Sequence, residues 1–175
     1  AVWGNQASVL VGDFLFSRSF QITVECGSLQ VLEILSNASA VIAEGEVQQL
    51  ANTNDLSISK SDCLAVITAK TAQLFAAACQ IGAVVADQPR PISQALEHFG
   101  LNFGIGFQLI DDLIDYSASD KTIGKKVGDD FREGKVTLPV LLTYQKGSKE
   151  EREFWERTIE HGEIQEGDLE FAITT

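Results

Sequence analysis

Three aspartates interrupt an otherwise apolar stretch of the sequence, FQLIDDLID, at positions 111, 112 and 115. If this stretch is helical, Asp111 and Asp115 lie about 40° apart around the axis, and Asp112 lies about 100° from Asp111. Two carboxylates about 5–6 Å apart repel each other by about 3 kcal/mol at an effective dielectric constant of about 20, and burial adds a desolvation penalty. The spacing therefore indicates a site where bound cations offset the repulsion.

The ligand type indicates which cation. Hard oxygen ligands without histidine or thiolate suit Mg²⁺, which keeps several waters and typically bridges protein carboxylates to substrate phosphates. We therefore predict that the three aspartates bind Mg²⁺ beside a phosphate-containing substrate. The alternative is a solvated acidic face paired with lysines, and it fits the neighbours less well because they are apolar: Leu109, Ile110, Leu113 and Ile114.

A glycine-punctuated stretch with several lysines follows the aspartates, TIGKKVGDDFREGKVTLP. Flexible backbone that carries Lys125 and Lys135 could close over a diphosphate, which their ammonium groups would bind. Asp129 and Asp130 resemble a second acidic pair, but Arg132 and the lysines can neutralise it locally. We therefore interpret this pair mainly as part of a mixed-charge surface.

Apolar residues recur at helical spacing almost throughout, and no alternating strand pattern competes with them. Glycines and polar segments separate the periodic stretches, which predicts helices at residues 6–25, 29–50, 62–86, 92–117, 130–145 and 149–160. The segments LFAAACQIGAVVA and LNFGIGFQLI are apolar on most faces, which is typical of central helices that pack closely through alanine and glycine. The fold class predicted from the pattern is an all-α bundle.

Lys70 and Thr71 lie within the helix predicted over residues 62–86. Two interpretations of the lysine stay open. It either extends along the apolar surface toward solvent or points into the bundle as another phosphate contact.

Composition limits the class of partner. The 175 residues suit one domain, and 13 basic against 25 acidic residues give a net charge of −12, which disfavours nucleic acid as the main partner. Residues 147–175 hold nine of the acids and three of the bases. The longest uncharged run, residues 71–86, is too short for a membrane span. Three scattered cysteines indicate neither a disulfide framework nor zinc and favour a reducing, cytoplasmic location.

Several motifs in the same order resemble the trans-isoprenyl diphosphate synthase family. They are AKTAQLF, FQLIDDLIDY, which resembles the family's second aspartate-rich motif, and IGKKVGDDFREGKVTLP. The opening AVWGNQASVLVGDFLFSRSFQ and the segment VIAEGEVQQL resemble the long-chain octaprenyl and decaprenyl type. The resemblance runs from residue 1 to about residue 143. It implies an isoprenoid-synthase-type helical bundle with a central cavity, formed by a single all-α domain over residues 1–175 that ends in acidic tail helices at 147–175.

The resemblance also implies an activity and roles for particular residues. The activity is Mg²⁺-dependent condensation of an allylic diphosphate with isopentenyl diphosphate, which makes a long-chain all-trans polyprenyl diphosphate for quinone side chains. By position, Asp111 resembles the principal Mg²⁺ ligand, supported by Asp112 and Asp115. The residues that would hold the diphosphate or lie near the developing cation are Lys70, Thr71, Gln108, Lys125 and Lys135, and Glu46 and Gln49 would face the cavity.

One feature of the family is absent from the sequence. Members carry two aspartate-rich motifs on facing helices, and the first is missing here, so we expect the chain to be the C-terminal portion of a synthase and inactive alone. The alternatives are a non-catalytic or regulatory subunit, a structural bundle that binds stray divalent cations, and a terpene cyclase. The combined string of motifs favours the condensing enzymes. We also expect a homodimer, by resemblance and because long apolar helices would bury more surface in a dimer.

Overall fold

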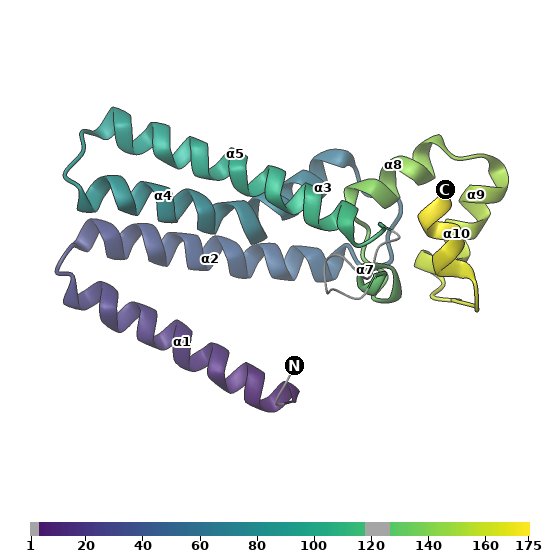
Figure 1. Cartoon of the computed structure of the whole chain (residues 1–175), viewed down its shortest axis with the longest axis horizontal. Coiled ribbons are helices and arrows are strands. Elements are labelled where there is room, and N and C mark those ends of the chain that lie inside the picture. Colours follow the sequence, from purple (N-terminus) through teal and green to yellow (C-terminus); the bar gives the residue numbers. More distant parts are fainter. Residues whose placement is uncertain (1–3, 118–126) are drawn as a thin grey trace.

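The structure, a computed structural model, describes residues 4–117 and 127–175, and every regular element in these two ranges is a helix (Figure 1). The predicted all-α class is confirmed. The elements are α1 (Asn5–Glu25), α2 (Leu29–Ala51), α3 (Lys60–Ile67), the π-helical turn η1 (Thr68–Ala72), α4 (Gln73–Val85), α5 (Arg90–Ile114), α7 (Asp129–Arg132), α8 (Leu138–Lys146), α9 (Lys149–Trp155), the π-helical turn η2 (Glu156–Glu160) and α10 (Asp168–Thr174).

Helices α2, α4 and α5 lie side by side and form the long part of the molecule, while α1 packs on α2 at one end only (Figure 1). Side-chain caps mark two of the helix starts. Ser28 accepts a hydrogen bond from the Val31 backbone N–H at the start of α2, and Ser59 and Asp62 form a capping box at the start of α3. These local signals match the boundaries predicted from sequence to within two residues.

The pairing of α5 with η1 and α4 depends on two glycines of α5. A Cβ atom on Gly100 would lie 2.4 Å from the Phe75 carbonyl oxygen, and one on Gly104 would lie 2.6 Å from the Ala72 Cα. The facing alanines are also fully buried, with Ala72 at 0% and Ala76 at 1% exposure. The two backbones therefore approach more closely than larger side chains allow, as predicted from the alanine- and glycine-rich segments.

A second packing centre lies at the other end of the molecule, where α7 to α10 gather (Figure 1). Phe131 of α7 is completely buried, and its ring centroid lies 6.1 Å from that of Trp155 and 6.3 Å from that of Phe154. The Arg157 guanidinium bonds both carboxylate oxygens of Asp168 at 2.7 and 2.9 Å, which fastens α10 to η2. The acidic C-terminal helices thus anchor the short helix α7.

The single helix predicted over residues 130–145 is wrong, because the chain forms two helices there, α7 and α8. Gly134 has a φ of 66°, in the left-handed region that interrupts a helix. Pro139 then lies in the first turn of α8, where its missing N–H costs nothing. The loop between the two helices places Lys135 beside the end of α5.

Large apolar side chains remain exposed on α1, α4 and α5. The continuous helix Lys60–Val85 is also long and apolar enough, by composition alone, to cross a membrane. Core helices of soluble proteins meet the same criterion, and this helix packs along α5 and carries Lys70 and Thr71 to a pocket that several charged side chains line. We therefore interpret it as a bundle helix.

Substitution of Gly100 tests the close approach of α4 and α5. Gly100→Ala should lower the free energy of unfolding by about 2–3 kcal/mol, because the new methyl group meets backbone atoms that no rotamer change can move. Gly106→Ala, in the same helix but with no atom within 4 Å of its Cβ position, should be neutral or stabilising by up to about 1 kcal/mol. Urea unfolding of both variants measures the difference, and equal effects would contradict the packing described here.

Candidate functional site

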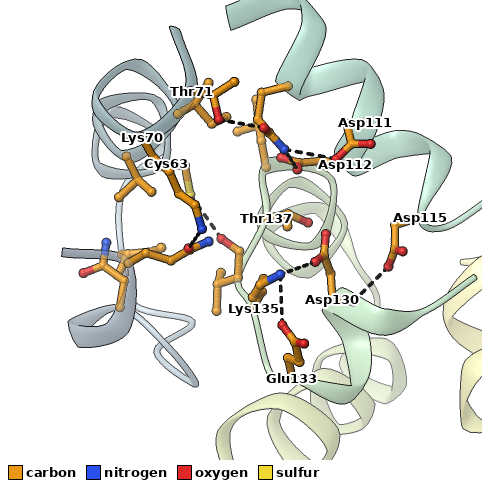
Figure 2. A pocket seen from close by; sticks show the side chains of 18 of the residues that line it. Cys63, Lys70, Thr71, Asp111, Asp112, Asp115, Asp130, Glu133, Lys135 and Thr137 are labelled. Atoms are coloured by element: carbon orange, nitrogen blue, oxygen red, sulfur yellow. Dashed lines mark hydrogen bonds and ion pairs between the residues drawn. The ribbon is translucent and has the colours of Figure 1, made fainter. Parts of the chain in front are cut away.

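A cavity of about 390 Å³ lies between α2, the α3–η1 segment, the end of α5 and the loop that follows α7 (Figure 2). Seven of the eight site residues predicted from sequence line it: Lys70, Thr71, Gln108, Asp111, Asp112, Asp115 and Lys135. The eighth, Lys125, lies outside the described residues. The structure therefore brings together residues that are up to 65 positions apart in the sequence, counted from Lys70 to Lys135.

Asp112 is the most electrostatically perturbed acid of the pocket. Its side chain lies in the last turn of α5, where the helix dipole is unfavourable to negative charge, and the residue is only 6% exposed. Burial raises the pKa of this carboxyl from 3.8 to about 6, and the negative charges of Asp130 and Asp111 add to the rise. The Gln108 side-chain amide opposes it by donating a hydrogen bond of 2.8 Å to Asp112 Oδ1. A cation beside Asp112 would relieve this cost.

Asp115 has a different environment, because α5 ends at Ile114 and Asp115 is the capping residue. Its carboxylate oxygen Oδ2 accepts a hydrogen bond of 3.0 Å from the backbone N–H of Asp130, and its carbonyl oxygen accepts one of 2.9 Å from Gly128 (Figure 2). The residue is 2% exposed. Asp115 therefore ties the start of α7 to the end of α5, a structural role that the sequence pattern did not indicate. Its role as a metal ligand stays a prediction.

The loop after α7 brings one lysine and more carboxylates to the same cavity. Lys135 Nζ lies 2.6 Å from Asp130 Oδ1 and 2.9 Å from Glu133 Oε2. Burial alone would lower the pKa of Lys135, but the bonds to these two carboxylates hold it above its usual value, so the ammonium stays charged. Arg132 pairs with Asp129 at 3.0 Å. Basic residues thus neutralise the second acidic pair, as predicted, but Asp130 lines the cavity with its side chain 16% exposed and does not lie on the surface.

On the opposite wall, the π-helical turn η1 carries Lys70 and Thr71 (Figure 2). Lys70 Nζ lies 2.5 Å from Gln49 Oε1 and 3.1 Å from Glu46 Oε2, both on α2. Lys70 therefore reaches the cavity, as one of its two interpretations held, and its contact with phosphate stays a prediction. The Thr71 hydroxyl donates a hydrogen bond of 2.7 Å to Gln108 Oε1. Thr71, Gln108 and Asp112 therefore form a continuous chain of hydrogen bonds.

Cys63 also lines the cavity, but its thiol is not activated as a nucleophile. The thiol is buried and contacts the Val136 carbonyl oxygen at 3.6 Å. Burial, with smaller contributions from nearby carboxylates, raises its pKa to about 11. A thiol with so high a pKa is a poor nucleophile near neutral pH.

The oxygen donors of the pocket fit a hard divalent cation whose coordination is completed by substrate. Among residues 4–117 and 127–175, no three acidic, histidine or cysteine groups converge closely enough to hold a metal ion by themselves. Mg²⁺ is usually bound by one or two protein carboxylates together with waters and substrate phosphates, so such a cluster is not required. Asp130 was not among the predicted site residues, yet its carboxylate lies between Lys135 and Asp115 in Figure 2, and its charge helps to raise the pKa of Asp112. In the sequence, this residue is marked only by its place in the Asp129–Asp130 pair that follows Gly128.

Replacement of Asp112 tests the electrostatic cost of the pocket. The pKa of this carboxyl is higher in the folded than in the unfolded protein, because burial disfavours its charged form. Its contribution to the free energy of unfolding is therefore fully present below pH about 4, where the carboxyl is neutral, and is lost as the pH rises through about 6. Without divalent cations, Asp112→Asn should therefore raise the free energy of unfolding by about 1–3 kcal/mol above pH 6, and the gain should vanish below pH 4. Urea unfolding across this pH range measures it. Glu166→Gln, at an exposed position, is the control, and a gain for Asp112→Asn that does not vary with pH would contradict the prediction.

Comparisons with known proteins identify the family of the chain. The Polyprenyl synthetase family model matches residues 1–175. The octaprenyl diphosphate synthase of Escherichia coli K12 is 48% identical over 162 residues, which cover 93% of this chain and 50% of the relative. The corresponding enzyme of Haemophilus influenzae is 45% identical over 176 residues, covering 100% of this chain and 54% of the relative. The chain thus spans about half the length of these curated relatives.

Solved structures show the same fold. A polyprenyl synthase from Caulobacter crescentus, complexed with calcium and isoprenyl diphosphate, superposes with a TM-score of 0.93 at 52% identity, over 98% of this chain and 52% of that chain. A decaprenyl diphosphate synthase from Rhodobacter capsulatus superposes with a TM-score of 0.88 at 49% identity, over 99% of this chain and 53% of that chain. With a family model matched along its whole length, the chain belongs to the polyprenyl synthetase family.

Proposed function

We propose that the protein carrying this chain condenses an allylic diphosphate with isopentenyl diphosphate and, by repeating the step, makes a long-chain all-trans polyprenyl diphosphate of the kind used in quinone side chains. One observation carries the proposal: a pocket of carboxylates and ammonium groups lies beside a row of aromatic side chains. Phe107 and Phe103 lie one and two turns before Asp111 on α5, and both are more than half exposed. Their rings pack on Phe75 at 5.4 and 5.5 Å. A diphosphate with a growing apolar chain needs both surfaces.

The carboxylates would hold the metal. Asp111 and Asp112 supply hard oxygen ligands in the proposed site, and Asp115 orients the backbone around them through its bond to Asp130. Bound Mg²⁺ supplies charge that stabilises the departing diphosphate. The excess of carboxylates disfavours the diphosphate anion in the metal-free pocket, so substrate binding should require the metal.

The lysines would hold the diphosphate oxygens from two sides. Lys70 approaches from η1 and Lys135 from the loop after α7, and each is already oriented by carboxylate or amide oxygens. Lys125 is proposed as a third contact because of its place in the family motif. A charge held in position before substrate arrives needs little reorganisation when the leaving group departs.

The polar chain on η1 and α5 would face the allylic carbon. In the reaction, the allylic C–O bond breaks, the diphosphate leaves with the electron pair, the isopentenyl double bond attacks the allylic carbon, and a proton is lost to the departing diphosphate. Thr71 donates its hydroxyl proton to Gln108, so its oxygen can turn lone pairs toward developing positive charge. Gln108 is held in turn by its bond to Asp112. The pair thus offers oriented dipoles rather than a nucleophile.

Removal of the principal carboxylate tests this proposal. In the full-length protein, Asp111→Ala should reduce Mg²⁺-dependent incorporation of labelled isopentenyl diphosphate by about 100-fold or more while the fold is retained, because charge stabilisation at the leaving group is lost. Glu166→Ala, at an exposed position far from the pocket in sequence, is the control and should leave incorporation unchanged. Full activity of Asp111→Ala, or cyclic hydrocarbons as products of the wild type, would contradict the proposal.

We further propose that the protein is a homodimer in which α1 is covered. This helix has no buried residue in the described chain, and its exposed apolar side chains include Val9 at 62%, Phe14 at 65% and Phe16 at 57%. A contiguous apolar face of this kind commonly marks a protein interface. Sedimentation of the full-length protein should give twice the monomer mass, and Phe14→Glu should weaken the association. A wild type that sediments as a monomer would refute this proposal.

A further inference from the structure

The π-helical turn η1 lies between two helices at very short range. Its hydrogen-bonding pattern includes the Gln73 backbone N–H bonded to the Thr68 carbonyl oxygen, five residues earlier. Gly104 of α5 approaches it from one side, where a Cβ atom would lie 2.6 Å from Ala72 Cα. Gly45 of α2 approaches it from the other. Turns of this kind recur at functional sites, and here the turn carries Lys70.

Gly45 meets the backbone of Lys70 itself. A Cβ atom on Gly45 would lie 2.9 Å from the Lys70 backbone nitrogen, 2.9 Å from Ala69 Cβ and 3.2 Å from the Ala69 carbonyl carbon. Two of these three atoms belong to the main chain, so no side-chain rotation would relieve the contact. Any side chain at position 45 would therefore push α2 and η1 apart.

The same turn of α2 holds the other end of Lys70. Gln49 Oε1 lies 2.5 Å from the Lys70 ammonium nitrogen and Glu46 Oε2 lies 3.1 Å from it. Gly45, Glu46 and Gln49, which we call the α2 clamp, thus contact both the backbone and the ammonium group of one lysine. The Lys70 side chain is 32% exposed, so the ammonium reaches the cavity.

We propose that the α2 clamp positions Lys70 for diphosphate binding, with Gly45 as the residue that sets the separation of α2 and η1. This rests on the proposed function, because it assigns Lys70 to the allylic diphosphate. A shift of α2 moves the Gln49 and Glu46 acceptors and the Lys70 backbone relative to each other, and the ammonium loses its fixed direction into the cavity. Gly45 touches neither substrate nor metal in this account and is a positioning residue.

Binding of each substrate alone tests the clamp without requiring turnover. In the full-length protein with Mg²⁺, Gly45→Ala should raise the Kd for geranyl diphosphate about tenfold or more, measured by calorimetry, while the Kd for isopentenyl diphosphate changes less than twofold. A general loss of folding would weaken both alike. Gly82→Ala, a helical glycine of α4 with no atom within 4 Å of its Cβ position, is the control and should change neither Kd.

A second variant covers the case in which Gly45→Ala does not fold. Gln49→Ala removes the acceptor 2.5 Å from the ammonium without adding an atom at the α2–η1 contact, and it should produce the same selective rise. The proposal is overturned if either folded variant binds geranyl diphosphate as tightly as the wild type does, if both Kd values rise together, or if the wild type binds no geranyl diphosphate. A wild type that binds both substrates but does not condense them would refute the proposed function and leave the clamp to be decided by the Kd values.

Discussion

The burial of carboxylates at the end of α5 is the constraint on which the rest of the structure depends. Asp112 and Asp115 are both nearly inaccessible to water, at 6% and 2% exposure, and they lie at the negative end of a 25-residue helix. Such charges destabilise a fold unless other groups compensate. The protein supplies an amide from Gln108, a backbone N–H from Asp130 and the ammonium of Lys135 near by. The raised pKa of Asp112 shows that this compensation is incomplete.

Close helix packing makes the pocket possible. Without the small residues on α4 and α5, the helix that carries Lys70 and Thr71 could not approach the helix that carries Gln108 closely enough for the 2.7 Å bond between Thr71 and Gln108. At the other end, burial of Phe131 between Phe154 and Trp155 holds the loop that carries Lys135. The acidic C-terminal region thus supports the site through its apolar side chains and through the buried Asp168, which pairs with Arg157.

Much of this arrangement follows from local sequence signals. Helical periodicity, with glycines and polar segments between the periodic stretches, predicted the long helices, and the family resemblance assigned to one site seven residues that line one cavity. Local signals failed where distant contacts decide the outcome. The bond from the Asp130 N–H to Asp115 joins residues 15 positions apart, and the Lys70–Gln49 bond spans 21 positions. Gly134 and Pro139 are the sequence signals for the break between α7 and α8, and the prediction of one helix over residues 130–145 passed over them.

In our proposal, the buried carboxylates at the end of α5 are retained for a cation that they share with a diphosphate. A crystal structure of the full-length protein with Mg²⁺ and an allylic diphosphate tests it most directly. We expect an octahedral ion with an oxygen of Asp111 or Asp112 and a diphosphate oxygen about 2.0–2.1 Å away. An ion bound elsewhere, or a diphosphate held by the lysines with no metal at these aspartates, would contradict the account.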